Sequence, residues 1–197
     1  MDPSIAEWRK AERSRLLAAR KEPSREDYVS WSEAIELRLV EQLSRLTPRV
    51  LGAYWPHRDE YDPMPLAAWH AGLGGDVALP AVVMRGQPLE YRPWTPDAPM
   101  APGRFSFGIP EPVNGPVVTP DLLLVPLLGF DAAGYRLGYG GGYFDRTLAA
   151  WSSRPKTIGV GFELGRMPTI QPQPHDIPLD MIVTEAGVFA GGGRIAL

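Results

Sequence analysis

The chain has 197 residues, a formal net charge of -3 and no cysteine. Its 44% hydrophobic and 22% charged residues are typical of a globular protein and exclude extended disorder. A chain of this length can bury about 70% of its unfolded surface, so we expect a single domain over residues 1–197. The lack of cysteine excludes disulfides, thiolate zinc sites and a thiol nucleophile.

No segment has the pattern of a signal peptide or the ~20 apolar residues of a membrane span, so a cytoplasmic protein without membrane contact is expected. The net negative charge and the presence of only one short basic stretch argue against nucleic acid as a partner. We also expect a monomer or a weak homodimer.

The first predicted element is a basic helix over residues 4–21. Between residues 8 and 21, all the charged side chains are basic except one acid, Glu12. Arg9 and Arg13 are four residues apart and share a helix face, and Lys10 is three residues from Arg13. Such a face is either solvated surface or a source of cations for a bound anion.

A second helix is predicted to begin at Ser24, which forms a capping-box pattern with Asp27. Apolar residues then recur at helical spacing as far as Leu46, and Thr47-Pro48 ends the helix. The pattern predicts an amphipathic helix that covers one face of the core.

Strands and helices alternate along the remaining chain. Strands are expected at 50–54, 77–79, 89–91, 122–125, 157–162 and 181–184, and helices at 63–73 and 143–151. This order predicts an α/β layered fold with a mainly parallel sheet. Residues 88–120 contain nine prolines and are expected to form either a long surface loop or a flap that walls a ligand cleft.

The most informative segment places four glycines among the five residues 138–142, after a strand and before a helix. Glycine allows positive φ and close approach of the backbone to a ligand, and converging N–H groups bind anions, usually phosphate. Arg136 could add a two-pronged contact. Asp145 could hold Mg²⁺ or simply favour the helix N-terminus. The segment is neither GxGxxG nor a Walker A loop, so without its context a tight structural turn remains an equal alternative.

The string RLGYGGGYFDRTLA, preceded by LLLVPLLGFD, resembles the 5-formyltetrahydrofolate cyclo-ligase family. RKAERSRLLAARK, GAYWPHRDEYD, FGIPEP and PQPHDIPLDMIVTEAGVF match the same family in order along the chain. The resemblance implies ATP- and Mg²⁺-dependent closure of 5-formyltetrahydrofolate to 5,10-methenyltetrahydrofolate with release of ADP and phosphate. It also implies a three-layer α/β sandwich of the sugar-phosphate isomerase/CoA-transferase type. The family commonly has two tyrosines before the aspartate, whereas this chain has Tyr143-Phe144.

The resemblance and the residue chemistry together give candidate site residues. Asp145 and Arg136 are the catalytic candidates, and Asp145 and Asp176 are the candidate Mg²⁺ ligands. ATP is expected to contact Arg9, Lys10, Arg13, Arg136, Gly138, Gly140, Gly141, Gly142 and Tyr143. The folate is expected to contact Trp55, Glu60, Tyr139, Tyr143 and Phe144, with Glu60 accepting hydrogen bonds from the pterin.

Each candidate also has a purely structural interpretation. Trp55 fits a core aromatic residue, Glu60 a surface acid and Asp176 a turn residue, whereas Asp180 is expected to be structural and His70 a satisfied, partly buried histidine. Two other functions stay open, a nucleotide-binding regulatory domain without turnover and an isomerase or transferase of the same fold that acts on a sugar phosphate.

Overall fold

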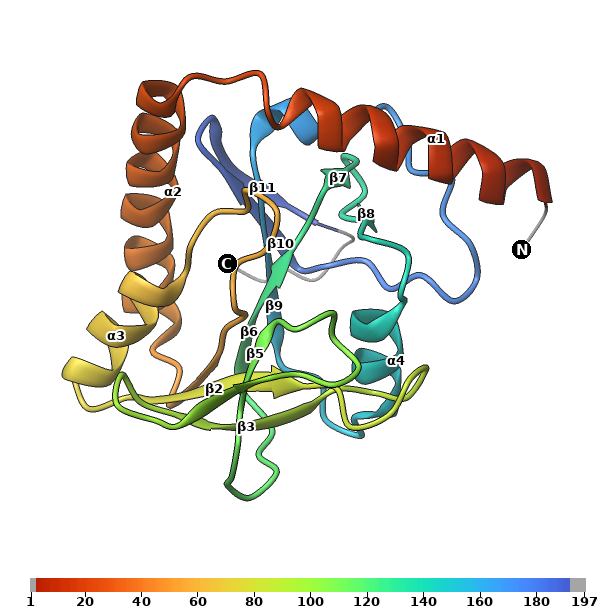
Figure 1. Ribbon diagram of the computed structural model, residues 1–197. Helices are drawn as coiled ribbons and strands as arrows, with labels where there is room; N and C mark the ends of the chain where they lie inside the picture. The colour runs from red at the N-terminus through yellow and green to blue at the C-terminus, as the bar shows by residue number, and fades with distance from the viewer. Residues whose placement is uncertain (1–2, 192–197) are drawn as a thin grey trace.

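The structure, a computed structural model, describes residues 3–191 and is built on one seven-stranded sheet (Figure 1). The strand order is β11-β10-β9-β6-β1-β2-β3. The four inner pairings are parallel, and only β10–β11 and β2–β3 are antiparallel. The predicted, mainly parallel sheet is thus confirmed. Its strands are β1 Val50–Gly52, β2 Asp76–Ala81, β3 Glu90–Trp94, β6 Leu122–Pro126, β9 Lys156–Val160, β10 Met181–Thr184 and β11 Gly187–Ala190.

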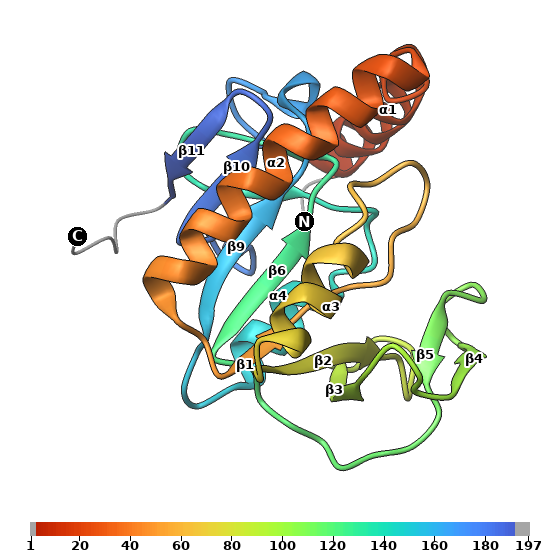
Figure 2. The same ribbon diagram turned by 90° about the vertical axis from the view of Figure 1, so that its left-hand side faces the viewer.

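Helices cover both faces of this sheet and make the three-layer arrangement expected from the sequence. The helices α2 and α3 lie on one face, and α4 lies on the other (Figure 2). None of the helices in residues 3–191 is long and apolar enough to cross a membrane. The helices are α1 Pro3–Ala19, α2 Arg25–Leu46, α3 Met64–Gly72 and α4 Tyr143–Ala150, with a 3₁₀ turn, η1, at Glu163–Gly165.

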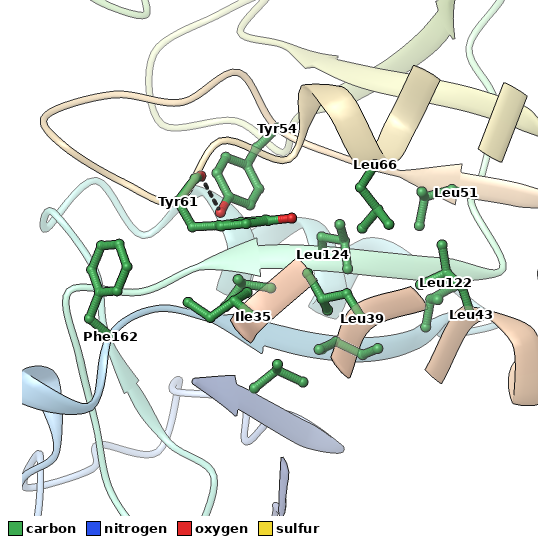
Figure 3. Close-up of a cluster of buried hydrophobic side chains, with 13 residues drawn as sticks. Ile35, Leu39, Leu43, Leu51, Tyr54, Tyr61, Leu66, Leu122, Leu124 and Phe162 are labelled. Carbon is green, nitrogen blue, oxygen red and sulfur yellow. Dashed lines mark hydrogen bonds between the residues drawn. The ribbon is translucent and has the colours of Figure 1, made fainter. Parts of the chain in front are cut away.

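The central strand β6 shows why both faces must be covered. Leu122 and Leu124 pack in the cluster that contains Ile35 and Leu39 of α2 (Figure 3). The alternate residues of β6 point the other way and pack with Leu148 of α4. Successive side chains of a strand face opposite sides, so an uninterrupted apolar run requires a helix layer on each side.

The predicted start and end of α2 are confirmed in detail. The Ser24 hydroxyl accepts a hydrogen bond from the Asp27 N–H, and the Asp27 carboxylate accepts one from the Ser24 N–H. Thr47 closes the helix in the left-handed conformation, with φ 44°. The helix therefore has fixed ends, which hold its apolar face over the sheet.

The proline-rich stretch differs from a plain surface loop. It contains β3 and a hairpin of β4 Met100–Pro102 with β5 Pro110–Pro112. Its prolines are compatible with strands because an edge ribbon leaves many N–H groups unpaired. Strand β1 is shorter than expected, ending at Gly52, and the sequence patterns gave no sign of β11.

The basic helix α1 lies across the end of the sheet at which the parallel strands terminate (Figure 1). Its Leu16 is fully buried against Leu128, which follows β6, and against Met167 and Ile170, which follow β9. The two short strands β7 Gly129–Phe130 and β8 Arg136–Leu137 form a ribbon beside it. This packing brings the basic face of α1 to the carboxyl ends of β1, β6 and β9, the edge at which open α/β sheets bind ligands.

Candidate active site

A pocket of about 400 Å³ lies at this edge of the sheet. It is lined by residues from α1, the segments after β1 and β2, the β4–β5 hairpin, the glycine loop, the start of α4 and the segment before β10. We define the glycine loop as residues 138–142. The flap interpretation of the proline-rich stretch is supported, because residues 105–111 of the hairpin line one wall of the pocket.

The glycine loop has the geometry of an anion cradle. Gly140 and Gly142 adopt positive φ, 95° and 63°, whereas Gly138 and Gly141 do not. Within the described chain, the N–H groups of residues 140–142 donate no hydrogen bond, and so they are available to a ligand. Two arginines hold carbonyls of this loop, since Arg13 Nε donates to Gly138 O at 2.8 Å and Arg146 Nη2 donates to Gly141 O at 2.5 Å.

Two of the three predicted cations of α1 reach the pocket. Arg9 is buried and Arg13 half-buried, and both line the cavity. Burial and the neighbouring Arg9 lower the pKa of Arg13, because two guanidinium groups share a restricted space. An anion bound between them would relieve this repulsion. Lys10 is exposed and does not line the cavity.

Both predicted metal-binding aspartates line the pocket, and each is engaged by an arginine. Arg136 Nη2 lies 3.1 Å from Asp145 Oδ2, and the Ile177 N–H donates to Asp145 Oδ1 at 3.0 Å. Arg9 Nη2 lies 2.5 Å from Asp176 Oδ2, in a pair whose side chains are 4% and 8% exposed. Together these contacts tie the segment before β10 to α1, to β8 and to the start of α4.

Glu60 is not the surface acid of the structural interpretation, because only 6% of it is exposed. Its carboxylate accepts a hydrogen bond from the His57 N–H at 2.9 Å. Burial raises its pKa to about 7, and the contacts with Tyr139 and His57 and the charge of Arg20 limit the rise. A carboxylate with so few partners in a pocket has free acceptor capacity for a ligand.

Four of the pocket's aromatic side chains belong to the residues predicted to contact the folate. Trp55 and Tyr139 line the cavity on the Glu60 side, and Tyr143 and Phe144 line it at the start of α4. Tyr139 lies edge-on to His57, with ring centroids 6.1 Å apart. The Arg136 guanidinium lies 5.8 Å from the centroid of the Phe144 ring, a contact that the ring makes without a hydroxyl.

Sequence reasoning missed two contributions to the site. Phe105 and Glu111 line the pocket from the proline-rich stretch, which carried no residue-level prediction. Arg20 is buried behind Tyr139 and hydrogen-bonds to its hydroxyl. The signal for Arg20 was present in the spacing, because it follows Arg13 by seven residues and therefore shares its helix face.

The other predictions concern structural residues. Asp180 is structural as expected, since its carboxylate accepts from both the N–H and the hydroxyl of Thr157. His70 is buried, but its Nε2 has no partner within the described residues, so the expectation of a satisfied histidine was wrong. His175 is exposed beside Asp176.

These features define an α/β protein in which a glycine loop with the geometry of an anion cradle and a buried carboxylate line one pocket. The family model described as the 5-formyltetrahydrofolate cyclo-ligase family matches residues 5–185. The chain belongs to this family, which confirms the resemblance and the cyclo-ligase class expected from the sequence.

Named relatives agree with this assignment. The chain is 31% identical over 157 residues to 5-formyltetrahydrofolate cyclo-ligase from Mycolicibacterium smegmatis, covering 74% of this chain and 79% of the relative. It is 37% identical over 101 residues to the enzyme of the same name from Haemophilus influenzae, with 48% of this chain aligned. That alignment spans 54% of the Haemophilus protein, about half its length. The NMR structure of Aquifex aeolicus 5,10-methenyltetrahydrofolate synthetase superposes with a TM-score of 0.80 at 28% identity, covering 96% of this chain and 95% of that one.

Proposed function

We propose that the protein catalyses the ATP-dependent cyclisation of 5-formyltetrahydrofolate to 5,10-methenyltetrahydrofolate, with release of ADP and phosphate. The observation that carries this proposal is the single pocket that joins the glycine loop and the arginines of α1 to Glu60 and its aromatic neighbours. The first group suits a polyphosphate and the second suits a flat heterocycle with N–H donors. Membership of the cyclo-ligase family supports the assignment.

The reaction needs activation of a formyl group that is both a poor electrophile and bonded to a poor leaving group. The formyl oxygen attacks the γ-phosphorus of ATP, and the bond from that phosphorus to the bridging oxygen breaks to leave ADP. N10 then attacks the activated carbon and loses its proton, and the carbon–oxygen bond breaks to release phosphate. The protein's task is to align the two substrates and to stabilise negative charge, rather than to form a covalent bond.

The phosphate side of the pocket would receive the triphosphate of ATP. The free N–H groups of residues 140–142 and the guanidinium groups of Arg9 and Arg13 supply donors and positive charge. Arg136, fixed by Asp145 on one side and by the Ile177 carbonyl on the other, is held in place to stabilise charge on the transferred phosphoryl group. Gly138 and Tyr143 complete this side, with Lys10 acting from outside the pocket.

The carboxylates of Asp145 and Asp176 fit a magnesium ion. Residues 3–191 contain no cluster of three or more potential metal ligands, but Mg²⁺ bound to ATP needs only one or two carboxylates. Each of these carboxylates lines the pocket and has two oxygens with several lone pairs, so an arginine contact does not exhaust its capacity. When bound, Mg²⁺ would neutralise phosphate charge.

The folate side would place the pterin between Trp55 and the aromatic residues Tyr139, Tyr143 and Phe144. The Glu60 carboxylate would accept hydrogen bonds from the amino and ring N–H groups of the pterin. Charge-assisted hydrogen bonds of this kind are roughly twice as strong as neutral ones because the acceptor is ionised. We also propose that the protein works in the cytoplasm as a monomer or weak homodimer and that it binds no nucleic acid.

Absorbance of the methenyl product tests the function directly. Mixing the protein with 5-formyltetrahydrofolate, ATP and Mg²⁺ should produce the methenyl chromophore together with an equal amount of ADP. Omission of ATP should abolish both signals. ATP binding without turnover would instead indicate a regulatory domain, and turnover of a sugar phosphate without the chromophore would indicate the isomerase alternative.

A further inference from the structure

Arg20, just beyond the end of α1, connects three segments that meet behind the pocket. Its Nη2 donates to Leu127 O at 2.8 Å, in the segment that follows β6. Its Nη1 donates to the Tyr139 hydroxyl at 2.9 Å and to Arg58 O at 3.4 Å. The residue is only 6% exposed, so these contacts lie largely out of water. A planar guanidinium with several donors in fixed directions suits such a junction, whereas a lysine would not reach all three acceptors.

The position of Arg20 excludes direct contact with substrate. It is absent from the pocket lining, whereas its partners Tyr139 and Arg58 line the pocket. Tyr139 belongs to the glycine loop, and Arg58 lies two residues before Glu60. Arg20 is therefore placed to act on the folate side through its neighbours.

We propose that Arg20 is a positioning residue that, through its hydrogen bonds to the Tyr139 hydroxyl and the Arg58 carbonyl, holds the Glu60 loop and Tyr139 in the arrangement that binds folate. The inference rests on the proposed role of Glu60 as the pterin acceptor. It adds a buried cation to a site in which Glu60 has no ion-pair partner within salt-bridge distance among the described residues. The charge of Arg20 favours the carboxylate form of Glu60 and opposes the effect of burial.

The other groups that face Glu60 do not supply this charge. Burial raises the pKa of Tyr54 and of Tyr139, so both are neutral near pH 7. Burial and Arg58 lower the pKa of His57, which is neutral there as well. Arg58 is exposed and screened by water. The charged and titratable groups around Glu60 are thus Arg20 beyond α1, Tyr28 from α2, Tyr54 after β1, His57, Arg58, Asp59 and Tyr61 of its own loop, and Tyr139 of the glycine loop.

The first test measures the titration of the Glu60 carboxyl group by NMR. In protein labelled with ¹³C-glutamate, the Glu60 carboxyl resonance is identified by its loss in Glu60→Gln, and its titration is followed in the free protein. Arg20→Met should move the titration midpoint up by about one pH unit, whereas Arg20→Lys should keep it near the wild-type value. Arg15→Met is the matched control, because it removes an exposed cation of α1 that pairs with Glu12. An unmoved midpoint in Arg20→Met would overturn the proposal.

The second test reads folate binding without ATP. The acidic limb of 5-formyltetrahydrofolate affinity should shift upward by the same amount in Arg20→Met. The shift should disappear when Glu60→Gln is combined with it. Circular dichroism and thermal melting check the fold, and Arg20→Gln, which keeps two N–H donors but no charge, serves if Arg20→Met does not fold.

The two tests distinguish a failure of the proposed role of Glu60 from a failure of the inference about Arg20. An NMR shift without any change in folate affinity would contradict the proposed role of Glu60 and leave its coupling to Arg20 intact. A persistent binding shift in the Glu60→Gln background would show that Arg20 does not act through Glu60, and would overturn the inference.

Discussion

The two sides of the pocket hold their carboxylates differently. On the side proposed to bind phosphate, Asp145 and Asp176 each pair with an arginine that also lines the cavity. On the side proposed to bind folate, Glu60 is buried with a backbone N–H and tyrosine contacts. Burial tends to raise the pKa of Asp176, but hydrogen bonds from Arg9 and Gln173 outweigh it and lower the pKa. The pKa of Glu60 is instead raised to about 7.

The difference shows how one cavity can serve two chemistries. Asp145 and Asp176 hold Arg136 and Arg9 in fixed positions through ion pairs. Glu60 has no such partner among the described residues, so a ligand that brings N–H donors would supply hydrogen bonds that the protein does not. The predictions below test this contrast, beginning with the largest expected effect.

Asp145→Asn should nearly abolish turnover, with a loss of about 10²- to 10³-fold in kcat. The amide keeps an oxygen for the Ile177 N–H but removes the negative charge that pairs with Arg136 and that is proposed to bind Mg²⁺. Steady-state kinetics at limiting Mg²⁺ measure the loss, with Asp97→Asn as an exposed control. Wild-type activity in Asp145→Asn would contradict both proposed roles of this residue.

The free energy of unfolding should depend on pH through Glu60, because burial raises the pKa of this carboxyl group. A carboxyl group whose folded pKa is raised favours folding when protonated, and this contribution is lost as pH rises. Between about pH 4.5 and pH 7, Glu60 should therefore lower the free energy of unfolding by about 3 kcal/mol. Urea unfolding of wild type and Glu60→Gln measures the difference, which should grow with pH in favour of the variant. Parallel pH curves for the two proteins would show that Glu60 is not buried in its charged form.

Much of the architecture could be predicted because local patterns decide it. The capping box at Ser24 fixed the start of α2, and the apolar run 122–125 required a strand covered on both faces. The β4–β5 hairpin could not be predicted, because proline lowers the strand propensity of residues that pair only at an edge. Strand β11 pairs antiparallel to β10 through a tight turn that carried no clear signal.

Many of the residues that line the pocket could be named from the sequence, but the contacts between them could not. The glycine loop and Glu60 were found from a resemblance and from residue chemistry. The pair between Arg9 and Asp176 joins positions 167 residues apart, and no local pattern reveals such a contact. The burial of Glu60 was also hidden, because its neighbours His57, Arg58 and Asp59 are typical of an exposed loop. The packing of α1 brings Arg9 to Asp176, and Glu60 is buried by segments that meet only in the folded chain.

Glu60→Gln should weaken 5-formyltetrahydrofolate binding and spare ATP. A charge-assisted hydrogen bond contributes about 1.5–3 kcal/mol, so the expected loss is roughly 10- to 150-fold in affinity. The amide also offers a donor where only an acceptor is wanted. Calorimetry with each substrate measures both affinities. A change in ATP affinity instead would place Glu60 at the nucleotide.

Gly140→Ala should weaken ATP binding by about 5- to 30-fold, since a left-handed conformation costs a side chain about 1–2 kcal/mol. Gly140 has φ 95°, and an added Cβ would lie 3.3 Å from Arg13 Cζ. Gly72→Ala in α3 is the matched control, because its φ is not positive, its Cβ would meet open space and it does not line the pocket. Equal ATP affinities for the two variants would contradict the cradle.

Lys10→Gln should have the smallest effect, because Lys10 is exposed and lies outside the pocket lining. An exposed cation attracts ATP only through water, so we expect KM for ATP to rise by about two- to fivefold. High salt should remove this difference from wild type. Arg13→Gln removes a half-buried cation from the pocket, and its larger loss should persist in salt. A salt-resistant loss in Lys10→Gln as large as that of Arg13→Gln would show that Lys10 closes onto the phosphates when ATP binds.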